Sequence, residues 1–204
     1  MSLDKDFEHY YTSKPTSPFK VKKVVLSLKN GRMYKFKTPS GVFSFGQIDK
    51  ASKLLIEHAI IGETDRLLDL GCGYGVIGIT LKKENPDISL CMSDVNERAL
   101  EFAKINAKNN NIVADIRLGN LYEPWKDEIF DNIVCNPPIA AGKKVWEKII
   151  VEAPDHLSAK GKLQLVAYHN KGGERLKKIM KSVFGNVRET VKSGGIRVYV
   201  SIKL

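Results

Sequence analysis

From residue 66 onward, short apolar runs alternate with longer segments in which apolar residues recur every three or four positions. The runs with the length and character of buried strands are 66–70, 88–94, 113–118, 130–136 and 162–169. Helical periodicity falls between or after them, near 76–84, 96–109, 143–157 and 172–184. This alternation is typical of βαβ units, so we expect an α/β fold with a mostly parallel sheet and helices on both of its faces.

The sequence predicts a β-hairpin near each end of the chain. Near the start of the chain, two β-rich runs flank Asn30 and Gly31, and Asn-Gly is a strong signal for a tight hairpin turn. At the end of the chain, two further runs flank Gly194 and Gly195. We therefore expect an N-terminal β-hairpin extension and a main sheet that finishes in an antiparallel hairpin.

The 204 residues are enough for one large domain with a proper core. The first 20 residues lack a sustained period and contain two prolines, which is typical of an irregular arm. We assign residues 1–40 to the N-terminal arm and hairpin, and residues 41–204 to the main domain. At the start of the main domain, Asp49 can cap a helix.

The composition is that of a soluble globular protein, with 43% hydrophobic, 27% charged and 8% aromatic residues. No apolar run approaches the roughly 18 residues of a membrane helix, and the acidic, aromatic start differs from a secretory signal. We therefore expect a cytoplasmic protein. Cys72, Cys91 and Cys135 are odd in number and never spaced as C-x-x-C, and the four histidines are scattered, so we expect no disulfide framework and no metal site.

Charge is distributed unevenly along the chain, whose formal net charge is +10. Residues 1–50 carry a net +6, residues 51–159 a net −5 and residues 160–204 a net +9. Basic ends around an acidic middle favour an anionic partner that both ends contact, although solvated lysine faces would give the same distribution.

The segment from Asp69 to Gly75, Asp-Leu-Gly-Cys-Gly-Tyr-Gly, joins a strand to a helix through three alternating glycines. Glycine suits a place where the backbone turns tightly and a ligand approaches it closely. Asp94 ends the next strand about 20 residues further on, where a carboxylate can accept both hydroxyls of a ribose. Asp69 would repel a pyrophosphate but suits the positively charged end of S-adenosylmethionine, so this cofactor is favoured over a nicotinamide dinucleotide.

A second motif, Asn136-Pro137-Pro138-Ile139, directly follows an apolar strand. The residue before a proline is held in an extended conformation, and the two prolines stiffen the backbone. The Asn136 side-chain oxygen and the Pro137 carbonyl could then accept the two N–H bonds of an exocyclic amine. These contacts would orient the nitrogen and stabilise the positive charge that grows on it during methyl transfer.

These motifs, with Ser93-Asp-Val-Asn-Glu-Arg-Ala-Leu100 between them, stand in the order and spacing of the class I S-adenosylmethionine-dependent methyltransferases. More narrowly, the chain resembles the small-domain group related to the bacterial ribosomal RNA guanine-N2 methyltransferases over about residues 40–204. The segments Glu8–Pro15 and Ser40–Ser44 resemble its stand-alone single-domain members. The resemblance implies a Rossmann-like, seven-stranded sheet whose last strand is antiparallel, and a methyltransferase domain over residues 41–204.

The resemblance also implies roles for individual residues, among them contact of Asn120 with the adenine of the cofactor. The expected cofactor-binding residues are Asp69, Gly71, Cys72, Gly73, Gly75, Asp94, Val95, Asn120, Leu121 and Asn136. The expected catalytic residues are Asn136, Pro137, Pro138 and Ile139. Ile139 departs from many amine methyltransferases, in which an aromatic residue at this position stacks on the target base, so the identity of the base stays open.

We predict methyl transfer from S-adenosylmethionine to an exocyclic nitrogen, with guanine N2 of ribosomal RNA as the leading target and RNA or a ribosomal particle as partner. Adenine N6 and the amide of a protein glutamine present similar planar amines and remain alternatives. A non-catalytic RNA-binding or ribosome-assembly factor is the alternative from another class. A nucleotide-dependent oxidoreductase is disfavoured by the glycine spacing.

The basic ends of the chain are expected to lie beside the pocket mouth and to contact phosphates around an unpaired or flipped base. The residues chosen for this role are Lys22, Lys23, Arg32, Lys35, Arg175 and Lys178, with Lys171 and Lys181 close to them in sequence. Of the other candidates, Cys135 is expected to be a packing residue rather than a nucleophile, and His169 a satisfied polar residue. Phe43 and Phe45 could cover the cofactor.

Overall fold

The computed structural model of the chain describes residues 18–139 and 142–204. The strands of this part are β1 Val21–Ser27, β2 Met33–Pro39, β3 Arg66–Leu70, β4 Ser89–Asp94, β5 Asp115–Leu118, β6 Phe130–Cys135, β7 Leu157–Tyr168, β8 Arg188–Ser193 and β9 Ile196–Ile202. The α-helices are α1 Lys50–His58, α2 Val76–Glu84, α3 Glu97–Asn109, α4 Lys143–Glu152 and α5 Gly173–Phe184. The 3-10 helices are η1 Glu123–Trp125, η3 Ala153–His156 and η4 His169–Lys171. The segment Glu8–Pro15 lies outside the described residues.

The main sheet contains seven strands in the order β5-β4-β3-β6-β7-β9-β8. Strands β3 to β7 are parallel, with β3 paired to β4 on one side and to β6 on the other. Strand β9 is inserted antiparallel between β7 and β8, and it forms the expected hairpin with β8 about Gly194 and Gly195. The predicted Rossmann-like, mostly parallel α/β sheet is therefore confirmed.

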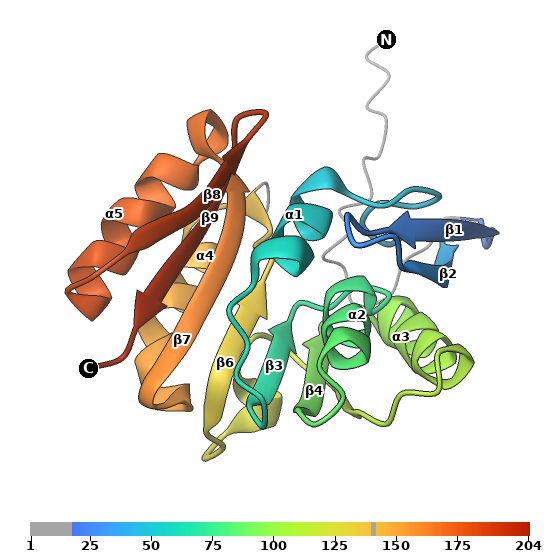
Figure 1. Cartoon of the computed structure of the whole chain (residues 1–204), viewed down its shortest axis with the longest axis horizontal. Helices are drawn as coiled ribbons and strands as arrows, with labels where there is room; N and C mark the ends of the chain where they lie inside the picture. Colours follow the sequence, from blue (N-terminus) through green and yellow to red (C-terminus); the bar gives the residue numbers. More distant parts are fainter. Residues whose placement is uncertain (1–17, 140–141) are drawn as a thin grey trace, which may run out of the picture.

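Helices cover both faces of this sheet, with α1, α2 and α3 on one side and α4 and α5 on the other (Figure 1). Leu55 of α1 and Phe102 of α3 belong to the first core, and Leu176 of α5 belongs to the second. Successive side chains of a strand point to opposite faces, so Leu67 enters the first core and Leu68 the second. This explains why the central strands read as continuous apolar runs.

The N-terminal hairpin of β1 and β2 is a separate two-stranded sheet that packs on α3. Asn106 of α3, which is fully buried, holds it in place. Its Oδ1 accepts from the Lys37 N–H at 2.8 Å, and its Nδ2 donates to the carbonyls of Lys37 and Tyr74 at 2.9 Å each. The expected hairpin extension is confirmed, and the domain boundary at residue 40 stays a prediction.

One helix ends earlier than its pattern predicts. The helix expected over 143–157 stops at Glu152, and the 3-10 turn η3 follows. Pro154 lacks the N–H that an α-helix requires and its ring crowds the preceding turn, so the helix cannot continue. Strand β7 then begins at Leu157, earlier than the expected run of 162–169.

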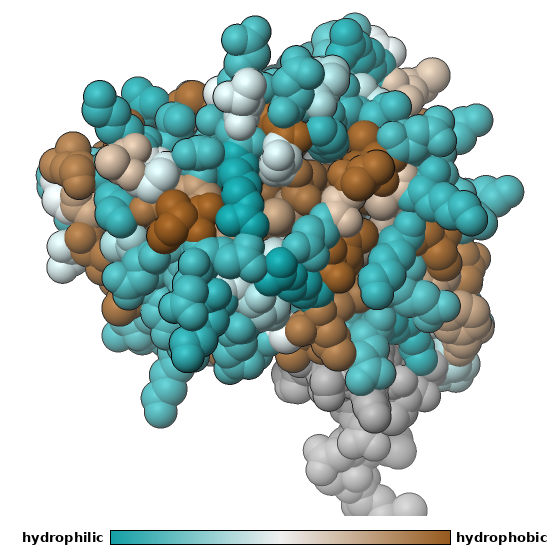
Figure 2. Space-filling model, turned by 90° about the horizontal axis from the view of Figure 1, so that it is seen from below, coloured by the Kyte–Doolittle hydropathy of each residue, from teal (hydrophilic) through white to brown (hydrophobic). Residues whose placement is uncertain are grey.

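The surface on the lower side of the molecule is mostly hydrophilic, with hydrophobic side chains gathered in small areas (Figure 2). Surfaces of this kind are ordinary for globular proteins, in which scattered apolar side chains need no special role. Over residues 18–139 and 142–204, no helix is long and apolar enough to cross a membrane.

We expect Asn106→Ala to lower the free energy of unfolding by about 2–3 kcal/mol, because it leaves the backbone groups of Lys37 and Tyr74 without partners. Denaturant unfolding followed by circular dichroism measures this change. Asn110→Ala is the matched control, because Asn110 is the partly exposed C-cap of α3 and donates a single bond of 3.2 Å to the hairpin, and it should cost under about 1 kcal/mol. Equal losses in the two variants would contradict the anchoring role of Asn106.

Candidate active site

A cavity of about 600 Å³ opens at the carboxyl ends of the parallel strands. Its walls come from the segments that follow β3, β4, β5 and β6, together with the start of α1 and the end of β7. In open α/β sheets ligands bind at this edge, beside the point where the strand order reverses. The expected site residues that line the cavity are Gly71, Cys72, Gly73, Asp94, Val95, Asn120, Leu121, Asn136, Pro137, Pro138 and Ile139.

The glycine loop after β3 presents bare backbone to this cavity. Gly71, Gly73 and Gly75 have φ values of +72°, +56° and +88°, which residues with a side chain rarely adopt. The space where a Cβ of Gly71 or Gly73 would stand is open, whereas a Cβ on Gly75 would lie 2.7 Å from Ile79. The first two glycines therefore leave room for a ligand, and the third allows α2 to pack.

Asp94, at the end of β4, fixes the shape of the glycine loop. One carboxylate oxygen accepts from the Gly73 N–H at 2.8 Å, and the other accepts from the Asn96 N–H at 2.9 Å. Burial raises the pKa of Asp94, and these backbone donors oppose the rise. Because the carboxylate also lines the cavity, its position is compatible with the predicted contact to a ribose.

Asp69 is fully buried between β3 and α2, beneath the glycine loop rather than in the cavity wall. Its Oδ2 accepts from the Gly78 N–H at 2.8 Å, while its Oδ1 has no hydrogen-bond partner among the described residues. Burial, and to a lesser extent the nearby Asp94, raises the pKa of Asp69 to about 7. A buried oxygen without a donor suits a positively charged group, so S-adenosylmethionine fits the electrostatics of this region.

The segment after β5 forms another part of the cavity wall. The N–H of Gly119 donates to the carbonyl of Asp94 at 3.1 Å, which holds this segment against the end of β4. Asn120 and Leu121 follow, and Leu121 has a φ of +52°. A ligand whose ribose lies at Asp94 would therefore have Asn120 within the same cavity, as the expected adenine contact requires.

Asn136 lies in the cavity wall after β6, and its amide orientation is defined by hydrogen bonds. Its Nδ2 donates to Asp49 Oδ2 and to Ser52 Oγ, each at 3.0 Å. Both amide hydrogens are thereby engaged, which leaves Oδ1 as the acceptor for a ligand. The Pro137 carbonyl accepts from the Ile139 N–H at 2.8 Å and keeps one further lone pair.

Asp49 and Ser52 are candidate site residues that the sequence reasoning missed. The sequence predicts Asp49 only as a helix cap, and Asp49 Oδ2 does accept from the Ser52 N–H at 2.7 Å to cap α1. Both residues also line the cavity. More than eighty residues separate them from Asn136, and no local pattern in the sequence indicates that contact.

Two partly exposed aromatic rings line the cavity, those of Phe43 and Tyr168, with exposed fractions of 43% and 39%. Phe43 is predicted from the sequence as a residue that could cover the cofactor, whereas no feature of the sequence indicates Tyr168. Ile139 contributes an aliphatic wall, and a Cβ on Gly172 would lie 2.9 Å from it. An aromatic surface is thus available for a base on side chains other than Ile139.

Cys135 and His169 have the environments that the sequence analysis expects. Cys135 borders the cavity, but its thiol is buried, and burial raises its pKa well above the ordinary value. A thiol in this state forms little thiolate, which is the nucleophilic form. The Nδ1 atom of His169 lies 2.9 Å from the Tyr199 hydroxyl, so this histidine is satisfied by a hydrogen bond.

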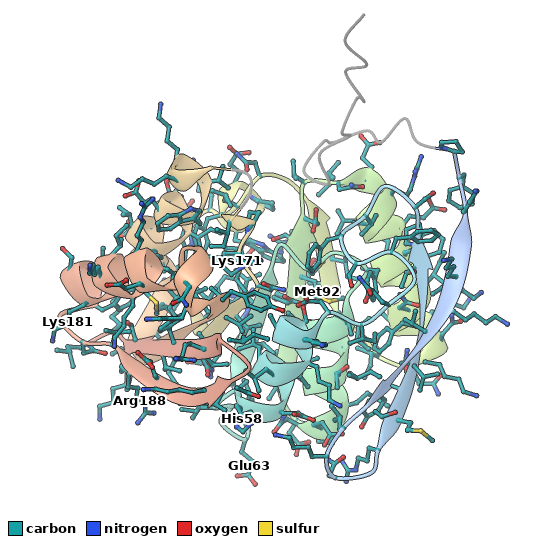
Figure 3. All side chains as sticks on the ribbon, turned by 90° about the horizontal axis from the view of Figure 1, so that it is seen from above. His58, Glu63, Met92, Lys171, Lys181 and Arg188 are labelled. Carbon is teal, nitrogen blue, oxygen red and sulfur yellow. The ribbon has the colours of Figure 1, made fainter. Side chains whose placement is uncertain are left out.

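The structure places some of the basic residues expected at the cavity mouth near the cavity and others away from it. Lys171 lines the cavity, and the Lys22 ammonium lies 5.0 Å from the centre of the Phe45 ring, close in sequence to Val42, Phe43 and Ser44 in the cavity wall. Lys171 lies near the middle of the molecule when it is viewed from above, whereas Lys181 and Arg188 lie at its outer edge (Figure 3).

The expected position of Arg32 beside the cavity mouth is wrong. Its guanidinium pairs with Glu84 at 3.2 Å, and Glu84 is the last residue of α2. Because α2 starts at the cavity and its nine residues span about 13 Å, Arg32 lies well away from the mouth. Asn30 and Tyr34 also donate to Glu84, so the turn of the hairpin is fastened at this distant end. Lys23, Lys35, Arg175 and Lys178 are exposed.

The known proteins that resemble this chain include methyltransferases. The family "Methyltransferase small domain" matches residues 33–200. The chain is 34% identical over 200 residues to the uncharacterized protein YbxB of Bacillus subtilis (strain 168), covering 97% of this chain and 99% of that protein. It is 37% identical over 167 residues to the ribosomal RNA small subunit methyltransferase C of Hamiltonella defensa subsp. Acyrthosiphon pisum (strain 5AT), covering 80% of this chain and 48% of that protein. The chain thus spans about half the length of the named methyltransferases it matches.

Solved structures share the fold. The Thermus thermophilus 16S rRNA N2 G1207 methyltransferase (RsmC), in complex with AdoMet and guanosine, matches with a TM-score of 0.77 and 22% identity, over 93% of this chain and 52% of that chain. A methyltransferase from Pyrococcus furiosus matches with a TM-score of 0.66 and 22% identity, over 74% of this chain and 81% of that chain. The fold is that of the class I S-adenosylmethionine-dependent methyltransferases, and the matched family is one of methyltransferases. The chain belongs to the methyltransferase small domain family.

We expect Asp94→Ala to weaken S-adenosylmethionine binding about 10- to 100-fold, because the variant loses a charge-assisted acceptor for the ribose and frees the glycine loop. Titration calorimetry measures this affinity. Asp115→Ala, on the neighbouring strand β5 with an exposed carboxylate paired to Arg117, is the control and should bind normally. Unchanged affinity in Asp94→Ala, or preferential binding of NAD by the wild type, would contradict the assignment.

Proposed function

We propose that this protein transfers the methyl group of S-adenosylmethionine to an exocyclic nitrogen of ribosomal RNA, with guanine N2 as the target. The observation that carries the proposal is the Asn136 amide, whose nitrogen is engaged by Asp49 and Ser52 so that its oxygen is left for a ligand. This amide and the glycine loop line one cavity, so an amine and the methyl donor can meet there. A protein acting on ribosomal RNA would work in the cytoplasm.

The proposed chemistry needs two acceptors and no strong base. The lone pair of an exocyclic amine is delocalised into the aromatic ring, which makes the nitrogen a poor nucleophile. Asn136 Oδ1 and the Pro137 carbonyl would accept its two N–H bonds, orient the nitrogen and stabilise the developing positive charge. Once the methyl group has been transferred the nitrogen is cationic, and its proton leaves readily.

The likenesses support RNA as the substrate. Relatives from Hamiltonella defensa and Psychromonas ingrahamii are named ribosomal RNA small subunit methyltransferase C, and the Thermus thermophilus structure contains guanosine. Lys22 and Lys171, at or close to the mouth, offer charge to phosphates on either side of an inserted base. Tyr168 or Phe43 would stack on the base in place of an aromatic residue at Ile139.

Adenine N6 and a glutamine amide remain the competing acceptors, because the same pair of oxygens would hold either planar amine. The basic mouth favours a nucleic acid over a protein. A non-catalytic RNA-binding protein would need neither the open glycine loop nor the oriented amide. These alternatives lead to different methylated products, so a single assay separates them.

We offer the wild-type protein tritium-labelled S-adenosylmethionine together with total RNA, DNA and protein from a strain that lacks its gene. We expect the label in RNA, with N2-methylguanosine as the labelled nucleoside. Asn136→Ala should lower the rate about 100-fold or more, because one preorganised contact to the developing charge is lost. Cofactor affinity should stay within severalfold. Cys135→Ser is the companion variant and should remain active.

The product decides among the alternatives. Label in N6-methyladenosine or in protein glutamine would identify a different acceptor from the one proposed. The absence of label in RNA, DNA and protein would favour a non-catalytic factor. A folded but inactive Cys135→Ser variant would point instead to a covalent mechanism on a pyrimidine carbon.

The charged mouth leads to a separate prediction about RNA affinity. We expect the triple variant Lys22→Glu, Lys171→Glu and Arg175→Glu to bind RNA more weakly and with a flatter salt dependence. Arg175 is included because it lies in the first turn of α5, four residues after Lys171. Each phosphate contact on a single strand contributes a slope of about −0.7, so the loss of three contacts is measurable. Filter binding at several salt concentrations gives this slope.

The control reverses three exposed cations that do not line the cavity, namely Lys108 in the last turn of α3, Lys160 near the start of β7 and Arg188 at the start of β8. It changes the net charge by the same amount and should alter RNA affinity far less. Cofactor affinity should be unchanged in both variants. Equal effects on RNA binding would mean that only overall charge matters, and a protein substrate would then become the leading alternative.

A further inference from the structure

The side chains of Asp49, Ser52 and Asn136 form a closed set of hydrogen bonds at the cavity wall. Asn136 Nδ2 donates to Asp49 Oδ2 and to Ser52 Oγ at 3.0 Å each, and Ser52 Oγ donates to Asp49 Oδ2 at 3.2 Å. The Ser52 N–H donates to the same Asp49 oxygen at 2.7 Å. One carboxylate oxygen thus caps α1 and holds the amide of a residue 87 positions away.

The direction of the Asn136 amide decides whether the side chain can accept a hydrogen bond from an amine. An asparagine side chain has an acceptor oxygen and a donor nitrogen that exchange places when the amide rotates by half a turn. With the oxygen toward the cavity, the side chain accepts from an N–H of the substrate. With the nitrogen there, two donors would face each other and the amine would be repelled.

The backbone conformation before a proline restrains the main chain of Asn136 but leaves this choice of amide direction free. The choice is made by Asp49 and Ser52. A carboxylate oxygen cannot donate a hydrogen bond, so Asp49 accepts only the nitrogen end of the amide. The Ser52 hydroxyl has already given its hydrogen to Asp49 and is likewise left as an acceptor.

We propose that Asp49 and Ser52 are positioning residues for methyl transfer, which hold the Asn136 amide with its oxygen toward the acceptor amine. The proposal rests on the proposed function, since it concerns the residue that would receive the amine. Capping alone does not account for the arrangement, because a cap requires the bond from the Ser52 N–H and not the bonds to Asn136.

Two substitutions at Asp49 separate capping from positioning. Serine and asparagine are both good N-caps, so Asp49→Ser and Asp49→Asn should both preserve the start of α1. Asparagine keeps an oxygen at the same reach, which can accept from Asn136. Serine is too short to reach that amide.

We expect Asp49→Ser to lower kcat about 10- to 100-fold while the dissociation constant of S-adenosylmethionine stays within about threefold. As the conservative variant, Asp49→Asn should recover kcat to within about threefold of the wild type. Ser52→Ala should lower kcat in the same way as Asp49→Ser, since it removes the second acceptor. Equal kcat values for Asp49→Ser and Asp49→Asn, at equal thermal stability, would overturn the proposal.

A second measurement needs no substrate, so it separates this proposal from the proposed function. In protein labelled with ¹⁵N-asparagine, the side-chain NH₂ signal of Asn136 is identified by its absence from Asn136→Ala. Its hydrogens should exchange with solvent about tenfold or more slowly in the wild type and in Asp49→Asn than in Asp49→Ser. Equal exchange rates would refute the positioning role. If the Asn136 side-chain hydrogens are protected from exchange but the protein methylates no RNA, only the proposed substrate is refuted.

Discussion

The connection between the end of β4 and the glycine loop after β3 is the constraint on which the site depends. The Ser93 carbonyl accepts from the N–H groups of Gly71 and Cys72 at 2.9 Å each, and the Asp94 carboxylate accepts from Gly73. The loop therefore takes its shape from a neighbouring strand together with the positive φ values that its own glycines allow. Because Gly71 and Gly73 are free of contacts at their missing Cβ positions, this shape leaves a ligand-sized opening.

The electrostatic character of the opening follows from the same connection. Asp69 is fully buried and Asp94 is partly buried, and Asp94 contributes to the raised pKa of Asp69. Two neighbouring carboxylates in a poorly solvated place favour protonation unless a positive charge compensates them. S-adenosylmethionine carries positive charge on its sulfonium and its amino group, so the burial that is unfavourable in the free protein suits the protein with its cofactor.

Helix α1 links the opposite wall of this arrangement to the rest of the fold. It packs on β7 and β9 through its apolar face, and its first turn meets the end of β6 at Asn136. The position of the amide is therefore set by the packing of a helix that precedes the parallel sheet in the sequence. The N-terminal hairpin is held in a similar way, through Asn106 and Glu84 on the outer helices.

The sequence by itself determined the elements and their order, because strand and helix periodicities are local and the glycine and proline motifs impose local backbone conformations. It also indicated Asp94, since a carboxylate at the end of the second parallel strand lies beside the end of the first. It overestimated one helix because the apolar period continued past Pro154. Contacts between distant segments were decided only by the tertiary structure: Asp49 appeared to be a cap and nothing more, and Arg32 appeared to be a residue of the mouth. Their partners, Asn136 and Glu84, lie 87 and 52 positions away, and pairing over such distances depends on how helices pack on the sheet, which no short pattern of residues specifies.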